Sequence, residues 1–399
     1  MPVLLTFRMQ TRTWLEANCP QSMRTRMVAG EEVNGGLKRR STNPDAWVWL
    51  SRMAEKGWTV PTWPEEYGGA GLGKDEFVVL IEELQRLNAR PPLGGMGVSM
   101  IGPTLLEYGN DEQKRRHLPA IARGELAWCQ GYSEPGAGSD LASLQTFAQD
   151  CGDHFIVNGS KIWTSGASHA DWMFCLVRTN REVPKHQGIS FLLFSMDSPG
   201  VSTRPIELID GHAPFCQTFF DDVRVPKADL VHKLNDGWTV GKRLLQHERS
   251  GLAALTSADR AGPMDRIKPS VPMYQLLARY TPPGASVDPA LRLELITIEQ
   301  LRRAFLLTQQ RMVEASASGT PGAATSIFKY VEANYVKAQL ELQLRIRGMQ
   351  GLGWEGADFD AEEIDMGRLW LESKSISIAG GSNEVQLNII AKRVLGLPD

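Results

Sequence analysis

The stretch from Trp128 to Thr179 constrains this chain more than any other, because it joins a glycine-rich turn to a run with strand periodicity. Its first half reads WCQGYSEPGAGSDLAS and crowds glycines, serines and an aspartate into one segment. Such a turn lets the backbone approach a ligand and offers N–H groups and hydroxyls to it. The second half alternates apolar and polar residues through Phe155, Val157 and Trp163, as half-buried strands do. We therefore expect a ligand-binding turn beside a sheet.

The strand half also carries residues suited to a planar ligand. Asn158-Gly159 is a typical hairpin signal, so we predict a turn at these two residues. Trp163 and Ser165 follow shortly after. An indole can cover one face of a flat aromatic ligand, and hydroxyls can satisfy the polar atoms at its ring edge. The pattern therefore predicts a site for a flat ligand with polar edges.

Charge, hydropathy and cysteine usage exclude several classes of function. The net charge of −3 argues against a nucleic-acid-binding surface. No apolar run is long enough to span a bilayer. The five cysteines show no metal-ligand spacing, so buried reduced thiols are expected. The first residues lack the apolar core of a secretory signal. We expect a cytoplasmic protein that holds no metal, binds no nucleic acid and does not span a membrane.

The distribution of periodic segments predicts an α+β protein of three domains. Residues 1–125 are predicted as a helical N-terminal domain, residues 126–235 as a β-domain and residues 236–399 as a helical C-terminal domain. Short strands at regular spacing indicate that the middle part is a small barrel or sandwich. The strand candidates are Phe155–Val157, Trp172–Val177, Ile189–Phe194, Val201–Pro205 and Thr218–Val225.

Helix signals place several boundaries in the outer domains. Pro44–Lys56 is predicted as a helix because Asn43 can cap it and Pro44 suits its first turn. Gly109 is predicted to end one helix, with another starting at Asn110 or Asp111. The longer helical stretches are predicted at Phe77–Leu87, Gly237–Ala254, Pro289–Ser316 and Thr325–Met349.

The motifs of the central stretch resemble the β-domain of the flavin-dependent acyl-CoA dehydrogenases. In that family the pattern Y/S/T-E-P-x-A-G-S-D, followed by N-G-x-K-x-W-x-(S/T), holds the isoalloxazine ring of FAD. This chain reads YSEPGAGSD and NGSKIWTS. Its GWTVPTWPEEYGGAG, Gly57–Gly71, is similar to a loop of the family's N-terminal domain. The resemblance implies FAD as cofactor, an acyl-CoA substrate, an acceptor like the electron-transfer flavoprotein, and a homo- or hetero-oligomer, dimeric or tetrameric.

The resemblance also implies where the proton-abstracting base lies. The family reaction is α,β-desaturation of an acyl-CoA thioester, in which a carboxylate removes the α-proton and the β-hydrogen leaves as hydride to flavin N5. Many members take this base from a C-terminal loop, where this chain has Gly380, whose N–H is implied to hydrogen-bond the thioester carbonyl. A minority takes it from a helix, where this chain has Glu248 followed by Arg249. Glu248 is therefore the predicted base and Glu384 the fallback; the alternative is that Glu248 is solvated or paired with an arginine.

Further contacts are implied position by position. The residues implied to contact the flavin ring or its ribityl chain are Gln130, Tyr132, Ser133, Trp163 and Ser165. Ser139 is implied near the CoA pantetheine or the flavin, and Ser382 and Glu384 near the adenylate end of FAD. The segment from Arg345 to Leu352, RIRGMQGL, is similar to the segment that takes the FAD pyrophosphate of a neighbouring subunit, with Met349 in place of a usual glycine.

Three functions stay open at this point. The motifs are most similar to bacterial acyl-CoA dehydrogenases associated with dicarboxylyl-CoA, steroid side-chain and other bulky substrates, often built from two unlike subunits. An Arg-x-x-Phe segment, which reaches FAD across a subunit interface in many members, is not found at residues 259–289. A catalytically silent subunit that completes a partner's FAD site is therefore one alternative. A flavin oxidase on the same fold is another.

Overall fold

The computed structural model describes residues 2–25, 27, 31–38, 41–249, 271–315 and 325–398, with the backbone alone for residues 2, 248–249, 309–310, 312–315 and 325. By its internal contacts the chain divides into two compact units. The first comprises Met1–Ile206 and Ala213–Arg260, and the second comprises Glu207–His212 and Ala261–Asp399. The division into three domains at residues 125 and 235 remains a prediction.

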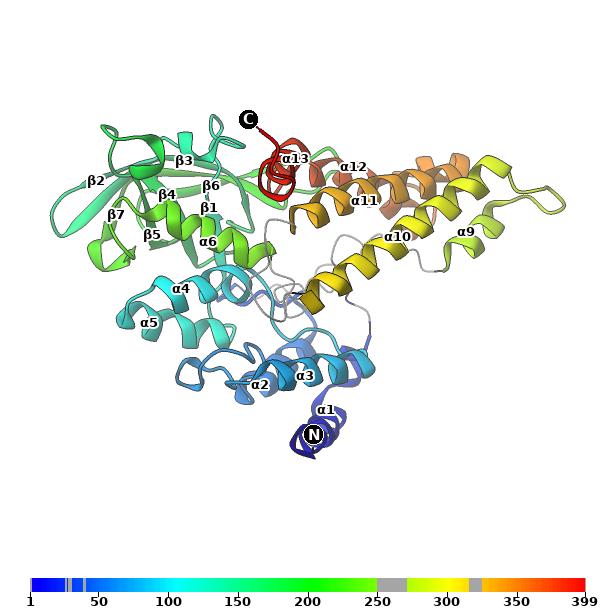
Figure 1. The fold of residues 1–399 in the computed structure, drawn as a ribbon, viewed down its shortest axis with the longest axis horizontal. Helices are drawn as coiled ribbons and strands as arrows, with labels where there is room; N and C mark the ends of the chain where they lie inside the picture. Colours follow the sequence, from blue (N-terminus) through cyan, green and yellow to red (C-terminus); the bar gives the residue numbers. More distant parts are fainter. Residues whose placement is uncertain are drawn as a thin grey trace. The chain divides into compact units, whose positions relative to one another are not determined.

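In the sequence, five helices of the first unit precede its strands and one follows them (Figure 1). They are α1 (Pro2–Asn18), α2 (Pro44–Glu55), α3 (Lys74–Arg86), α4 (Gly102–Tyr108), α5 (Asp111–Ala122) and α6 (Gly237–Arg249). The predicted cap of α2 is confirmed, because Asn43 Oδ1 accepts a hydrogen bond from the N–H of Asp45. Asn110 caps α5 in the same way through the N–H of Gln113, directly after Gly109. These boundaries follow from local chemistry alone.

The strands of the first unit form one eight-stranded sheet. Its order is β6-β7-β3-β2-β4-β5-β8, with β1 parallel to β4. All five predicted strands are confirmed, and β1, β2 and β8 are additional. The strands are β1 (Trp128–Gly131), β2 (Phe147–Asp150), β3 (His154–Ser165), β4 (Trp172–Arg178), β5 (Ile189–Ser195), β6 (Val201–Ile206), β7 (Phe215–Pro226) and β8 (Leu230–Val231).

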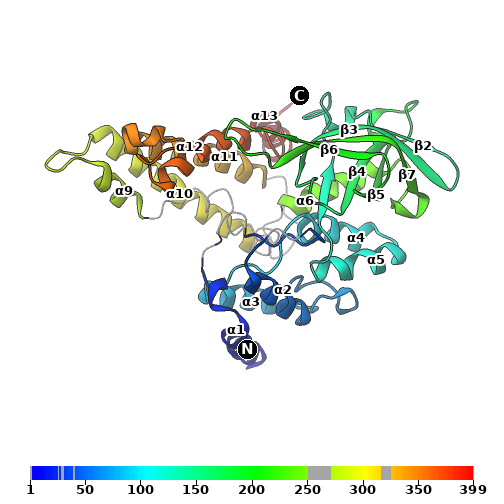
Figure 2. The same cartoon turned by 180° about the vertical axis from the view of Figure 1, so that it is seen from behind.

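Strand β4 is buried on both faces and separates two apolar cores. Phe174 and Leu176 point into a core shared with α4, α5 and α6. Met173, Cys175 and Val177 alternate with them and point into a second core, made with β3, β5 and β7. Figure 2 shows α6 lying along the sheet, where it contacts β4 and β5. The second core consists of strand residues together with Ala167, Ala170 and Met196 from the segments that join the strands.

The prediction of a hairpin turn at Asn158-Gly159 is wrong. Both residues lie inside β3, where the register with β7 shifts between Val157 and Gly159. The Asn158 side chain donates to Asp222 Oδ1 and accepts from the Asp222 N–H, at 2.8 and 2.9 Å. Gly159 has φ +141°, and a Cβ there would lie 2.8 Å from the Cα of Thr146. The pair forms a bulge, in which glycine allows close approach of the neighbouring strand.

The second unit is helical. Its helices are α9 (Met273–Tyr280), α10 (Pro289–Ala315), α11 (Thr325–Arg347), α12 (Ala361–Ile376) and α13 (Asn383–Ile389). The predicted stretches at residues 289 and 325 are confirmed as α10 and α11, and α11 ends in a 3-10 turn at Gly348–Leu352. The Arg347 side chain is buried at this turn, where it donates to Glu362 at 2.7 Å. This ion pair joins the end of α11 to the start of α12.

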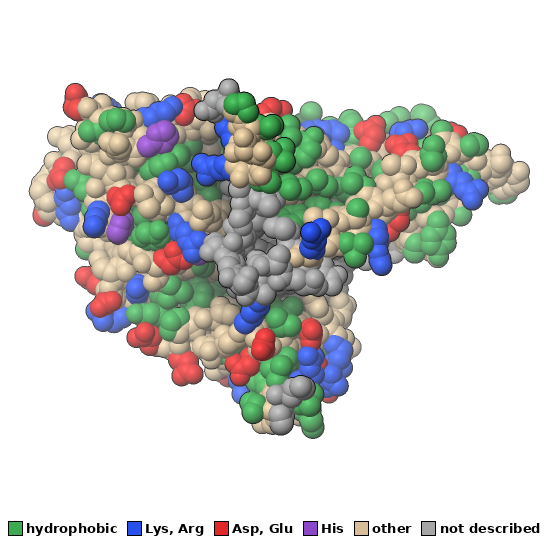
Figure 3. All heavy atoms as spheres, viewed as in Figure 1, with side chains coloured by type: hydrophobic (Ala, Val, Ile, Leu, Met, Phe, Trp, Pro, Cys, Tyr) green, Lys and Arg blue, Asp and Glu red, His purple; other side chains and the backbone are tan. Residues whose placement is uncertain are grey.

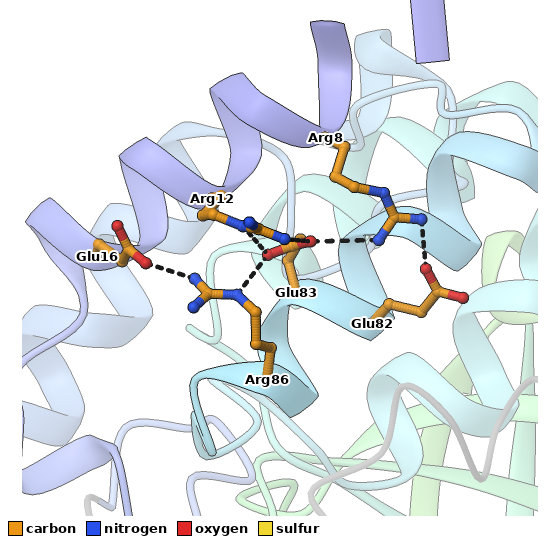
Figure 4. A network of polar contacts seen from close by, with 6 residues as sticks. All are labelled: Arg8, Arg12, Glu16, Glu82, Glu83 and Arg86. Carbon is orange, nitrogen blue, oxygen red and sulfur yellow. Dashed lines mark hydrogen bonds and ion pairs between the residues drawn. The ribbon is translucent and has the colours of Figure 1, made fainter. Parts of the chain in front are cut away.

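Helix α1 is joined to α3 by a cluster of charges around Glu83 (Figure 4). The Glu83 carboxylate is 1% exposed and accepts hydrogen bonds from Arg12 at 2.9 Å, from Arg86 at 2.8 Å and from Arg8 at 3.2 Å. Arg86 also pairs with Glu16 at 2.6 Å. Hydrogen bonding from Arg12, against the opposing effect of burial, lowers the pKa of Glu83 to about 2. The charged form of this side chain therefore stabilises the contact between the two helices.

Glu83→Gln is expected to lower the free energy of unfolding at pH 7 by about 2 kcal/mol, because the four charge-assisted hydrogen bonds from three arginines lose their charged acceptor. The folded-state pKa of Glu83 lies below its ordinary value of 4.5, so its contribution is complete above pH 4.5 and is lost as the pH falls towards 2. Urea unfolding of both proteins should therefore show a difference that closes below pH 4.5. Glu82→Gln, at the exposed neighbour of Glu83, is the matched control. An equal difference at pH 7 and pH 3 would contradict the assignment.

Candidate functional site

The glycine-rich turn lies between β1 and β2 in the sequence and is tied to β3 by a backbone hydrogen bond. Glu134 and Ala137 exchange two backbone hydrogen bonds at 3.1 and 3.0 Å, which makes a tight turn around Pro135-Gly136. The N–H of Ile162 donates to the carbonyl of Ser133 at 2.9 Å. A surface pocket of about 330 Å³ lies against the same turn. The turn is therefore fixed beside the residues of β3 that precede Trp163.

A buried ion pair supports this turn from below. Lys161 is 0% exposed, and its Nζ donates to Glu134 Oε1 at 2.8 Å and to the carbonyl of Tyr132 at 3.1 Å. The Glu134 carboxylate also accepts the N–H groups of Gln145 and Thr146, at 2.6 and 2.8 Å. Burial opposes the charge on Glu134, but the Lys161 ammonium and the N–H donors outweigh it and lower the pKa of the carboxyl. These hydrogen bonds fix the turn at Glu134 to Lys161 of β3 and to the backbone of Gln145 and Thr146.

Trp163 stands out in both backbone and side chain. Its φ is +60°, a conformation that bulky residues rarely adopt. The register of β3 against β7 shifts between Lys161 and Thr164, and this irregularity accommodates the unusual backbone. The residue is 53% exposed, and its indole meets Phe215 edge-on, with 6.1 Å between ring centroids. Strained backbone of this kind concentrates at functional sites, so an exposed indole here is a binding surface by expectation.

The other predicted residues of the turn differ in where they lie. Ser133 and Ser165 are half-buried, and Ser139 is exposed. Tyr132 is buried in the core with its ring edge-on to Phe174, 6.0 Å away. A contact of Tyr132 with a ligand at the turn would therefore run through its backbone.

The turn has open space beside two of its glycines, and a buried hydrogen-bond donor lies on the strand that precedes it. Among the described residues, no hydrogen-bond partner is found for Gln130 Nε2, although this atom is buried. A Cβ on Gly136 or Gly138 would meet no described atom within 4 Å. Gly131, in contrast, is required by packing, because a Cβ there would lie 2.5 Å from Met173 Sδ.

The predicted base lies at the end of α6, which runs from Gly237 to Arg249. The backbone of Glu248 is helical, as predicted, and its side chain lies outside the described residues. Residues 250–270 also lie outside the described residues. They include part of the stretch 259–289, in which the Arg-x-x-Phe segment was sought. Sequence reasoning gave no role to His247. The structure places it 3.1 Å from Glu107 of α4.

The remaining predicted residues all belong to the second unit. Gly380 has φ +65° in the loop between α12 and α13, and its carbonyl accepts from Gln386 Nε2 at 3.4 Å. Ser382 caps α13 by accepting the N–H of Val385 at 3.4 Å. The exposed Glu384 follows in the first turn, where hydrogen bonds from its own backbone N–H and from Ser382 lower its pKa.

Arg345 and Met349 lie at the end of α11 and in the turn that follows it. Arg345 forms an ion pair with Glu294 of α10. Met349 is mostly exposed, as is its neighbour Leu352. The sequence did not indicate the structural roles of Lys161, Glu134 and Glu107, because charged residues are expected to be exposed to solvent.

Comparison with known proteins decides the family. The profiles for the N-terminal, middle and C-terminal domains of acyl-CoA dehydrogenase match residues 8–125, 129–223 and 235–395. The acyl-CoA dehydrogenase IpdE1 of Mycobacterium tuberculosis is 38% identical over 392 residues, covering 98% of this chain and 97% of the relative. The chain is a member of the acyl-CoA dehydrogenase family. It is an oxidoreductase with the predicted fold of that family.

Solved structures agree with this membership. The structure titled "Tcur3481-Tcur3483 steroid ACAD" has a TM-score of 0.76 and 30% identity, covering 100% of this chain and 98% of that one. The ChsE4-ChsE5 complex of Mycobacterium tuberculosis has a TM-score of 0.74 and 28% identity, with the same coverage. Among the described residues, no helix is both long and apolar enough to cross a membrane. The same residues contain no group of three or more metal-ligating side chains.

The turn of this acyl-CoA dehydrogenase fits a flavin. The exposed indole of Trp163 can cover a ring face, and the buried Nε2 of Gln130 is a donor without a partner among the described residues. The open backbone at Gly136 and Gly138 leaves room for close approach. A flat ring with polar edges uses each of these features.

Proposed function

We propose that this protein is an FAD-dependent dehydrogenase that introduces an α,β double bond into an acyl-CoA thioester. The observation that carries the proposal is the turn at Ser133, which the buried Glu134–Lys161 pair fixes beside the exposed Trp163. Family membership supplies the reaction class. The geometry of the turn supports a preorganised site for the flavin ring.

In this proposal the first unit contributes most of the flavin contacts. Trp163 covers a ring face, while Ser133 and Ser165 offer hydroxyls at its edge. Gln130 donates its amide, and Tyr132 contributes its backbone. Ser139, exposed at the far end of the turn, is assigned to the pantetheine arm of the substrate or to the flavin.

The residues of the second unit are assigned by position, as the family resemblance implies. Ser382 and Glu384, at the start of α13, are assigned to the adenylate end of FAD. The turn after Arg345, with Met349, is assigned to the FAD of a neighbouring subunit. The Gly380 N–H is assigned to the thioester carbonyl, where it would stabilise enolate-like charge.

The proposed chemistry divides between the protein and its cofactor. FAD, when bound, accepts the β-hydrogen of the substrate as hydride. Glu248 removes the α-proton, and hydrogen bonding to the thioester carbonyl makes this proton more acidic. A dry site raises the carboxylate pKa and so strengthens it as a base. An acceptor like the electron-transfer flavoprotein then takes the electrons.

We assign the substrate to bulky acyl-CoA thioesters such as steroid side-chain derivatives, because one similar structure is titled a steroid acyl-CoA dehydrogenase. Two similar structures are also titled as pairs of unlike chains. Figure 3 shows hydrophobic side chains exposed along the helices of the second unit. The larger ones are Leu293, Leu307, Met349, Leu352, Ile378 and Leu395. This apolar surface supports an oligomer, which we propose to include an unlike partner chain.

The test is an absorbance spectrum of the purified protein followed by anaerobic titration with acyl-CoAs. The panel contains straight-chain, dicarboxylyl and steroid side-chain thioesters. We expect bound FAD that is bleached by at least one of them, with steroid side-chain thioesters most effective. FAD that binds only when a partner chain is added, and is bleached only with that partner's base intact, would favour the silent-subunit alternative. Reduced flavin reoxidised rapidly by oxygen would favour an oxidase. A flavin-free protein, alone and with its partner, would overturn the cofactor assignment.

A further inference from the structure

The N-terminal end of α6 is fixed by close packing on β5. A Cβ on Gly237 would lie 2.3 Å from the carbonyl carbon of Ser190, so the helix starts in direct contact with the strand backbone. Val240 and Leu244 are fully buried one turn apart. Position 248 lies four residues after Leu244, one turn further along the backbone of α6. The place of Glu248 therefore depends on how the last turn of α6 is held.

An acidic residue of α4 holds that last turn. The Glu107 carboxylate accepts two hydrogen bonds from the Arg243 guanidinium, from Nε at 2.8 Å and from Nη2 at 2.7 Å. Its Oε1 also lies 3.1 Å from Nε2 of His247. Arg243 and His247 are neighbours on the helix surface because they are four residues apart. One carboxylate thus spans the turn that leads directly into Glu248.

Glu107 itself stands on a rigid support. Thr104 and Leu105, on the same short helix, are fully buried. The π-helical segment Gly97–Ile101 precedes α4 and packs against α6, and such segments occur frequently at functional sites. Hydrogen bonding from Arg243 lowers the pKa of Glu107, so its carboxylate is charged at neutral pH. The contact is therefore a fixed, charged bridge between α4 and α6.

We propose that Glu107 is a positioning residue, which clamps Arg243 and His247 and thereby sets the place of Glu248 in the reaction. The inference rests on the proposed function, in which Glu248 is the base. A partly exposed ion pair contributes little to stability. A base displaced by about 1 Å, however, can slow a reaction about 10²-fold. The clamp therefore acts on proton abstraction and leaves folding and substrate binding nearly unchanged.

The experiment compares Glu107→Ala, Glu248→Gln and the double variant as holoenzymes with FAD bound. Two rates are measured with the acyl-CoA that bleaches the flavin fastest: anaerobic bleaching, and loss of deuterium from its α-carbon by mass spectrometry. Glu107→Ala should slow both rates about 10²-fold while the Kd for acyl-CoA stays within about 3-fold. In the Glu248→Gln background the same change should have no further effect, because Glu107 acts through Glu248.

A matched control and a second variant complete the design. Glu125→Ala breaks a similar two-bonded pair with Arg123 elsewhere in the first unit, and should leave both rates unchanged. Arg243→Lys keeps the positive charge but loses the bidentate contact with Glu107, so it should also slow both rates. This variant tests the clamp even if Glu107→Ala folds poorly. Equal slowing by Glu107→Ala in both backgrounds, or no slowing in either, would overturn the proposal. A Glu248→Gln variant as fast as wild type would remove the proposed base instead, and the clamp's role with it.

Discussion

Replacing Lys161 by methionine is expected to lower the free energy of unfolding by about 3–5 kcal/mol. The change leaves the Glu134 carboxylate buried without its ammonium partner, which is 2.8 Å away in the folded protein. It also removes the hydrogen bond to the carbonyl of Tyr132. Methionine fills similar space, so the loss comes from uncompensated charge rather than from a cavity. A loss of this size is a large part of the stability of a typical domain.

Urea unfolding measures this loss, with Lys185→Met as the matched control. Lys185 makes two contacts of 2.7 Å with Asp140, but its side chain is 47% exposed. Its replacement should therefore cost no more than about 1 kcal/mol. The Lys161→Met protein should also lose affinity for FAD, because the turn loses its support. Two lysine variants of equal stability would contradict the role given to the buried pair.

Glu248→Gln is expected to slow anaerobic flavin bleaching by acyl-CoA about 10²–10⁴-fold, the range for loss of a general base. Glutamine has nearly the same shape as glutamate but cannot accept the α-proton. The flavin spectrum and the Kd for acyl-CoA should change little, since the amide keeps the volume of the side chain. The effect should therefore appear in the rate of the chemical step rather than in binding.

Stopped-flow absorbance at saturating acyl-CoA makes this measurement. Glu299→Gln is the control, because Glu299 is also a glutamate in a helix; its side chain pairs with Arg302 and lies on the exposed side of α10. Its bleaching rate should match that of the wild type. If Glu248→Gln bleaches as fast as Glu299→Gln, Glu248 has no part in proton abstraction.

Features set by local chemistry could be predicted from the sequence. The caps at Asn43 and Asn110 and the break at Gly109 lie within a few residues of the groups they satisfy. The five longer strands were marked by alternating or continuous apolar runs. Strands β1, β2 and β8 have only two to four residues each, too few to show a period.

Features set by distant partners could not be predicted. Asn158-Gly159 looked like a hairpin turn because its bulge depends on Asp222, which is 64 residues away. Lys161 gave no sign of burial because its partner Glu134 is 27 residues away in the turn. The same holds for Glu107 and Arg243, which are 136 residues apart. The glycine-rich turn could be found from the sequence, whereas the buried charges that support it and the contact of Glu107 with Arg243 required the structure.

The central claim is that this chain couples removal of an α-proton to reduction of its own flavin. The most direct measurement is an anaerobic single turnover of the FAD-loaded protein with an acyl-CoA, undeuterated or deuterated at the α-carbon. The account predicts enoyl-CoA in an amount equal to the FAD reduced, formed more slowly from the deuterated thioester. FAD that stays bound but oxidised with every acyl-CoA in the panel would contradict it.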